Sequence, residues 1–178
     1  MEKQPTFSDR ELTVVNNAVA MAEELVSNYY KMSAGEWLRP RYDIKTRAEL
    51  TPQEIVEGPL AQIIRYEGKR ADSPLGSSTY DFYKICLQDQ AILNALQKNP
   101  NIDLYAFTLY VITHELIHIV RFSKFFQRFD ASPEEKHSEE IRVHELTHGI
   151  LDGVRVEGLD AVFEFYERWR HPLESYDG

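Results

Sequence analysis

The sequence is poor in cysteine and in basic charge, and each shortage excludes a class of protein. Cys86 is the only cysteine among 178 residues, so a disulfide framework is excluded and a reducing compartment is expected. Twenty Lys and Arg residues against 29 Asp and Glu residues give a net charge of −9. Such a chain lacks the basic excess that binds nucleic-acid phosphates or anionic lipid headgroups. We therefore expect neither a nucleic acid nor a membrane as its partner.

Long hydrophobic runs are also missing. The longest apolar stretch, Leu104–Val120, is interrupted by two histidines and a glutamate, which a membrane-spanning helix tolerates poorly. The N-terminal segment Met1–Arg10 is polar and has no apolar core of the kind found in signal peptides. We expect a cytoplasmic protein.

The rest of the composition is that of one globular domain, and we assign residues 1–178 to it. Hydrophobic residues make up 43% of the chain and charged residues 28%, so a packed core is expected. Ser8 followed by Glu11 is a capping box, which predicts a helix start at Asp9. Apolar periodicity predicts helices over residues 9–32, 90–97, 104–126, 134–151 and 158–169. The helix over 134–151 has a start signal at Ser132 and a stop or kink at Gly149 and Gly153, and Thr51 opens a short helix that Gly58-Pro59 is expected to close. A strand is predicted over 80–87, a strand or helix end over 60–67, and loops over 35–42 and 72–78. The predicted class is α+β, mostly helical with a small sheet.

Histidine is concentrated in one part of the chain. Five of the six histidines lie within 35 residues, from His114 to His148, and residues 114–118 read H-E-x-x-H. Histidines four residues apart are separated by about 40° around a helix axis, so both imidazoles reach one ion. Burying two imidazoles and a carboxylate in an otherwise apolar helix is costly unless a divalent ion compensates. The pattern therefore predicts a metal site at His114 and His118.

The same pattern returns 30 residues later, where residues 144–148 also read H-E-x-x-H. The connection between the two helices is short, so we expect them to be antiparallel with converging faces. The predicted ligands on the second helix are Glu140 and His144. Three neighbours compete with them, namely Glu139, His148 and His137.

With these motifs the chain resembles the zincin metallopeptidases, in particular the gluzincin group, over about residues 80–151. In that group a strand and a short helix precede the active-site helix, and residues 80–87 and 91–96 stand in this order before His114. The resemblance implies a zincin-like domain whose small sheet packs on the H-E-x-x-H helix. It also implies that His114 and His118 are the first two ligands, and that Glu140, 22 residues after His118, is the third.

The resemblance further implies one zinc ion per chain and hydrolysis of a peptide or protein substrate. A metal-bound water would attack the peptide bond, with Glu115 as the general base. Such families often carry an acidic residue four positions after the third ligand, oriented toward a ligand histidine. This chain has His144 there, so His144 is either a ligand itself or a partner of one.

Two other functions use the same residues. Glu115-x-x-His118 and Glu145-x-x-His148 match the paired motifs of di-iron or di-manganese helical bundles. Alternatively, four protein ligands drawn from the two helices would close a structural zinc site in a non-catalytic, metal-stabilised binding module. Two metal ions per chain would identify the di-metal protein. Four protein ligands around one zinc ion would identify the binding module.

Overall fold

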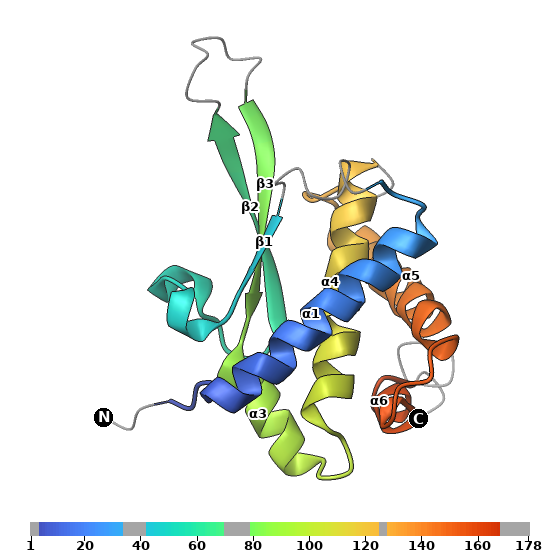
Figure 1. Cartoon of the computed structure of the whole chain (residues 1–178). Helices are drawn as coiled ribbons and strands as arrows, with labels where there is room; N and C mark the ends of the chain where they lie inside the picture. The colour runs from blue at the N-terminus through green and yellow to red at the C-terminus, as the bar shows by residue number, and fades with distance from the viewer. Residues whose placement is uncertain (1–3, 34–41, 70–78, 125–127, 168–178) are drawn as a thin grey trace. The chain divides into compact units, whose positions relative to one another are not determined.

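The computed structural model describes residues 4–33, 42–69, 79–124 and 128–167. The chain divides into two compact units, one made of residues 1–7 and 32–95 and the other of residues 8–31 and 96–178. The first unit carries a three-stranded sheet, and the second carries the long helices (Figure 1). The predicted α+β class, mostly helical with a small sheet, is confirmed.

The sheet has the strand order β1-β3-β2, formed by β1 (Tyr42–Lys45), β2 (Ala61–Lys69) and β3 (Thr79–Leu87). β3 pairs with β2 in antiparallel fashion and with β1 in parallel, so Ile85 stands opposite Ile63 on one side and Ile44 on the other. The predicted strand over 80–87 is confirmed, and segment 60–67 belongs to a strand rather than to a helix end.

β1 is a strand that the sequence did not predict, and the 3-10 helix over Arg47–Glu49 that follows it was not predicted either. The four residues of β1 are too few to show a clear alternation, and their hydrogen bonds come from the distant β3. Tyr42, assigned to a loop over 35–42, is the first residue of this strand. The remainder of that predicted loop, and the predicted turn over 72–78, lie outside the described residues.

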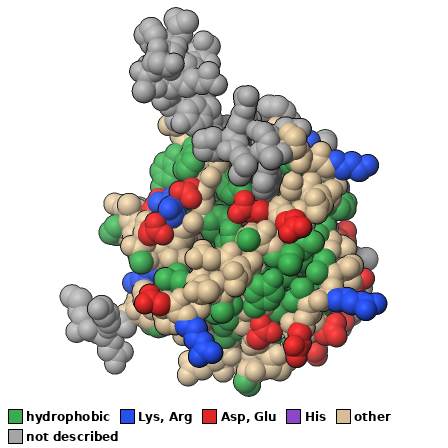
Figure 2. All heavy atoms as spheres, viewed as in Figure 1, with side chains coloured by type: hydrophobic (Ala, Val, Ile, Leu, Met, Phe, Trp, Pro, Cys, Tyr) green, Lys and Arg blue, Asp and Glu red, His purple; other side chains and the backbone are tan. Residues whose placement is uncertain are grey.

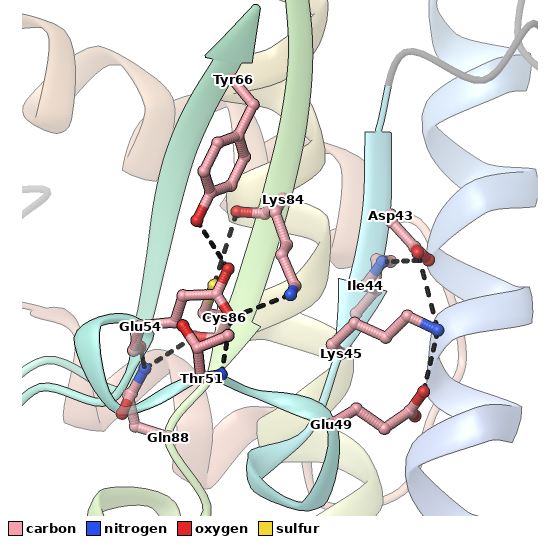
Figure 3. Close-up of polar contacts among 10 residues, drawn as sticks. All are labelled: Asp43, Ile44, Lys45, Glu49, Thr51, Glu54, Tyr66, Lys84, Cys86 and Gln88. Atoms are coloured by element: carbon pink, nitrogen blue, oxygen red, sulfur yellow. Dashed lines mark hydrogen bonds and ion pairs between the residues drawn. The ribbon is translucent and has the colours of Figure 1, made fainter. Parts of the chain in front are cut away.

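Two short 3-10 helices, η1 (Arg47–Glu49) and η2 (Pro52–Glu54), separate β1 from β2 in the chain. The short helix predicted from Thr51 is confirmed in its start, but it is one 3-10 turn that ends at Glu54, before the Gly58-Pro59 pair expected to close it. The buried Glu54 carboxylate accepts hydrogen bonds from the Tyr66 hydroxyl at 2.6 Å and from Lys84 Nζ at 2.9 Å (Figure 3). The Thr51 amide donates to the same carboxylate at 2.8 Å. These donors offset the desolvation of a buried charge.

The second unit is built from α1 (Asp9–Tyr29), α4 (Leu104–Ser123), α5 (Pro133–Asp152) and α6 (Leu159–Phe165), and α3 (Asp89–Lys98) follows β3 in the chain. Ser8 and Glu11 form the predicted capping box of α1. Asp103 and Ser132 cap α4 and α5 with their side chains, each accepting a backbone N–H of the first turn. The predicted helices are confirmed, with ends that differ by a few residues.

Four of the predicted helix ends need correction, since α4 ends at Ser123 and α6 at Phe165, where ends at 126 and 169 were predicted. α1 ends at Tyr29 rather than at residue 32, and Lys31 adopts a left-handed backbone with φ 53°. α5 continues through Gly149 and ends at Asp152 with Gly153 as its C-cap, so the predicted end at Gly153 is confirmed, whereas the helix does not stop at Gly149. One glycine costs a helix only about 1 kcal/mol, which the packing of α5 on α4 outweighs. Residues 125–126 and 168–169, predicted as helical, lie outside the described residues.

α4 forms the centre of the core of the second unit. Fifteen of its 20 residues are buried, and α1, α5 and α6 pack against it (Figure 1). Among the described residues, no helix combines the length and apolarity that crossing a membrane requires. On the face shown in Figure 2, side chains of both charge signs lie among hydrophobic ones, and no described histidine is visible. His114, His118 and His144 are buried.

Candidate metal centre

α4 and α5 face each other through a series of polar pairs. Along the two helices these pairs are Arg121–Glu139, His118–Glu140 and Tyr110–His144. Residue numbers fall along α4 as they rise along α5, so the helices run antiparallel with converging faces, as predicted. The α4 members share one face because they recur at spacings of eight and three residues, close to whole numbers of helical turns.

Three side chains from this seam bring possible metal ligands together. Nε2 of His118 lies 2.8 Å from one oxygen of Glu140, and Nε2 of His114 lies 3.1 Å from the other. Each of these three side chains offers one possible ligand atom, and the three atoms all lie within 4.8 Å of one another. Both histidines are buried, whereas the Glu140 side chain is 37% exposed. Glu140 therefore marks the side from which solvent reaches this His-His-Glu group.

The His-His-Glu group fits a zinc ion. Zinc prefers imidazole nitrogen and carboxylate oxygen, and donor atoms bound to it at about 2.1 Å in a tetrahedral shell are about 3.4 Å apart. The distances from Glu140 to the two imidazoles are close to this spacing. Nε2 of His114 is also buried without a hydrogen bond among the described residues, although a Glu140 oxygen is near. Once its proton is lost, such a ring nitrogen has a lone pair that a bound ion would satisfy.

Opposite charges hold the group together without metal. Burial lowers the pKa of His114, but the carboxylates of Glu115 and Glu140 outweigh burial and raise this pKa to about 10. Burial raises the pKa of Glu140, but the two histidines outweigh it and hold this pKa far below its usual range. Since metal ligands must be deprotonated, a metal ion bound by His114 would have to displace a proton from that ring.

Glu115 contacts the first of the two histidines. Its Oε1 accepts a hydrogen bond from Nδ1 of His114 at 3.1 Å. Because Glu115 holds the proton on Nδ1, the proton that His114 would give up to a metal ion is the one on Nε2, the nitrogen that faces Glu140. Glu115 thus orients the His114 ring in this structure, and its role as general base stays a prediction.

His144 lies beside the His-His-Glu group. Its Nε2 is 3.7 Å from Glu140, and its ring centroid is 4.3 Å from that of His114. On the opposite side of the ring, Nδ1 shares a hydrogen bond of 2.8 Å with the hydroxyl of Tyr110. The structure therefore brings His144 to the site, and its membership of the metal shell stays a prediction.

The competing residues of α5 have other neighbours. Glu139 is bound by Arg121, whose Nε and Nη2 donate to its two oxygens at 2.8 Å each. The ring of His148 packs against Phe163 of α6 with centroids 4.2 Å apart, and His137 is exposed. Among the described residues, none of the three competitors belongs to the His-His-Glu group.

Three neighbours of the site were not predicted, namely Tyr110, Arg121 and Tyr166. Tyr166 stacks on Tyr110 with centroids 4.2 Å apart, and burial, Tyr110 and the two site carboxylates raise its pKa well above the usual value. It is therefore a neutral phenol beside the cluster. The partners of Tyr110 and Arg121 are 34 and 18 residues away, so only helix pairing reveals them. The one local signal is spacing along the helix: Tyr110 precedes His114 by four residues, and Arg121 follows His118 by three.

Comparison of the chain with protein-family models, with curated proteins and with solved structures finds no match. The zincin resemblance therefore stays a prediction from the motifs. Function has to be argued from the geometry and chemistry of the site itself.

Proposed function

We propose that this chain is a zinc-dependent hydrolase that cleaves peptide bonds in a peptide or protein substrate. The observation that carries the proposal is the convergence of His114, His118 and Glu140 between α4 and α5. Three protein ligands leave one position of a tetrahedral shell open, as in catalytic zinc sites. Glu115, in contact with His114, brings a second carboxylate, so the two carboxylates balance the double positive charge of the ion.

The proposed roles follow from these contacts. His114, His118 and Glu140 would hold the ion, with Glu115 fixing the orientation of the His114 ring. When bound, zinc polarises a carbonyl oxygen and lowers the pKa of a water molecule to about 7. Glu115 would be the base that accepts the proton of the attacking water and returns it to the leaving amine.

A metal-stabilised binding module without catalysis is the second candidate. It is favoured by His144, whose Nε2 is only 3.7 Å from Glu140 while Tyr110 holds its Nδ1. A fourth protein ligand would close the shell, as in structural zinc sites. The coordination number of the cobalt-substituted protein, read from its visible spectrum, distinguishes the two candidates.

Metal content and metal binding test the proposal. Protein purified without added metal or chelator is expected to contain about one zinc ion per chain by elemental analysis. After chelation, added zinc is expected to raise the melting temperature progressively. His118→Ala should abolish this rise, whereas the control His137→Ala, at an exposed position of α5, should retain it.

Three results bear on the alternatives. A parent protein that takes up no metal contradicts the proposal, as does a His118→Ala variant that binds zinc as tightly as the parent. Two iron or manganese ions per chain would instead support a di-metal protein. One zinc ion without hydrolysis of any peptide in a broad fluorogenic mixture would support the binding module.

A further inference from the structure

Arg121 and Glu139 form a bidentate ion pair directly beside the His-His-Glu group. Nε and Nη2 of Arg121 each donate to a different Glu139 oxygen at 2.8 Å. Both residues are well buried: Arg121 is 9% exposed, and the Glu139 side chain is 13% exposed. Arg121 follows His118 by three residues, and Glu139 immediately precedes Glu140. The pair therefore joins α4 to α5 about one helical turn from the ligands.

Adjacent glutamates on one helix cannot both face the same pair of histidines. Successive residues are rotated by about 100° around a helix axis, so turning Glu139 toward His118 would turn Glu140 away. A guanidinium is a planar, rigid fork that fixes the direction of the carboxylate it binds. With Glu139 held by Arg121, the rotation of α5 that presents Glu140 to the histidines is set.

We infer that Arg121 is a positioning residue of the metal centre, which selects Glu140 as the carboxylate ligand by holding Glu139. The inference rests on the proposed function, because it presupposes that the His-His-Glu group binds a metal. Tyr30, the C-cap residue of α1, also interacts with the Arg121 guanidinium and ties it to a third helix. Arg142 approaches Glu139 only to 3.6 Å and is 63% exposed, so it contributes little to the orientation of Glu139.

A purely electrostatic role for Arg121 predicts a different pattern of metal affinity. If Arg121 only placed a positive charge near the site, Arg121→Met would remove a repulsive cation and tighten zinc binding. Arg121→Lys would then change nothing, because the charge is kept. If Arg121 positions Glu140, both substitutions weaken zinc binding, because both destroy the bidentate fork.

The experiment is a zinc titration of the full-length chain, in competition with a chromophoric chelator. The variants are Arg121→Met and Arg121→Lys, with Arg142→Lys as the control for an exposed arginine near the same carboxylate. We expect both Arg121 variants to bind zinc about 10- to 100-fold more weakly than the parent, as is typical when a partner of a metal ligand is lost. The control should bind as the parent does. The double variant R121E/E139R, in which the two charged residues exchange places, should bind zinc more tightly than Arg121→Met does.

The cobalt-substituted proteins provide a second readout that a loss of stability alone would not change. The visible spectrum should shift in Arg121→Lys, because the ligand geometry changes, and should be unaltered in Arg142→Lys. Parent-like zinc affinity in Arg121→Lys, or tighter binding by Arg121→Met, overturns the inference and leaves the proposed function standing. A parent that binds no zinc overturns both. If Arg121→Met does not fold, the zinc affinity of Arg121→Lys alone decides whether the inference holds.

Discussion

The hydroxyl oxygen of Tyr110 lies 2.8 Å from Nδ1 of His144, in the buried seam between α4 and α5. Tyr166 stacks on Tyr110 with the two ring planes only 9° apart, which fixes the direction of that hydroxyl. Because Tyr110 occupies Nδ1, the imidazole of His144 presents Nε2 to Glu140. Tyr110 thereby determines which nitrogen His144 offers to the site.

Removing this hydroxyl should affect both stability and metal binding. Tyr110→Phe deprives a buried ring nitrogen of its hydrogen bond, so the free energy of unfolding is expected to fall by about 1–3 kcal/mol. Zinc affinity is expected to fall by about 10-fold, because the His144 ring is no longer held in one orientation. Urea unfolding and zinc titration measure the two effects. Tyr105→Phe, on the same helix, is the control and should change the free energy of unfolding by less than about 0.5 kcal/mol.

Glu115→Gln should separate metal binding from hydrolysis. The amide oxygen of glutamine still accepts the proton of His114 Nδ1, so zinc affinity should fall by no more than about 10-fold. The amide cannot act as a base, so hydrolysis of a peptide substrate should fall by about 10²- to 10⁴-fold. Zinc titration and a fluorogenic peptide assay give the two numbers. Complete loss of zinc with Glu115→Gln would identify Glu115 as a ligand instead and would contradict the assigned roles.

The elements predicted well from the sequence are those with a local signal. The Ser8–Glu11 capping box and the start at Ser132 locate α1 and α5 because the residues that cap a helix stand next to it. β1 has no such signal. Its Tyr42 pairs with Tyr83, and that pairing, rather than the propensity of the four residues, makes the segment a strand.

The same distinction explains what could be predicted of the site. His114 and His118 are recognised from their spacing alone, since residues four apart share a helix face. The choice between Glu139 and Glu140 has no local signal, because both lie on the same helix and differ only in rotation. Arg121, on another helix, makes that choice, and a single sequence shows no pairing between the two helices.

Lowering the pH should destabilise the first unit, which carries the sheet, because Glu54 becomes protonated. Three donors lower the pKa of Glu54 from 4.5 to about 2: first the Tyr66 hydroxyl, then the Thr51 amide and then Lys84. Because the folded-state pKa lies below the unfolded value, the stabilisation is complete above pH 4.5 and is lost as the pH falls toward 2. Urea unfolding at a series of pH values should show the loss over this window.

The origin of the acid effect is checked by removing the titrating group. Glu54→Gln should reduce the dependence of the unfolding free energy on pH between 4.5 and about 2. Glu49→Gln is the matched control, because Glu49 is 59% exposed and forms a surface ion pair with Lys45. A Glu54→Gln variant with the full acid dependence of the parent would assign the effect to other carboxylates.

Three glycine-to-alanine substitutions should change the free energy of unfolding by different amounts and in different directions, because the backbone conformations and surroundings of the three glycines differ. Gly158 has φ +90°, and a Cβ there would collide with the carboxylate of Asp103, the N-cap of α4. Gly158→Ala should therefore lower the free energy of unfolding by about 2–3 kcal/mol, from backbone strain and a lost cap. Gly58 has φ +104°, and an added Cβ would meet no atom within 4 Å, so this position carries the strain alone. Gly58→Ala should cost about 1–2 kcal/mol.

Gly149→Ala is expected to stabilise the protein, unlike the other two substitutions. It lies within α5, is exposed, and has no atom within 4 Å of an added Cβ. Because alanine loses less backbone entropy than glycine in a helix, Gly149→Ala should raise the free energy of unfolding by about 0.5–1 kcal/mol. Denaturant unfolding monitored by circular dichroism measures all three variants. A destabilised Gly149→Ala would mean that α5 needs a flexible point after His148, and the continuous helix seen here would then be only one of its conformations.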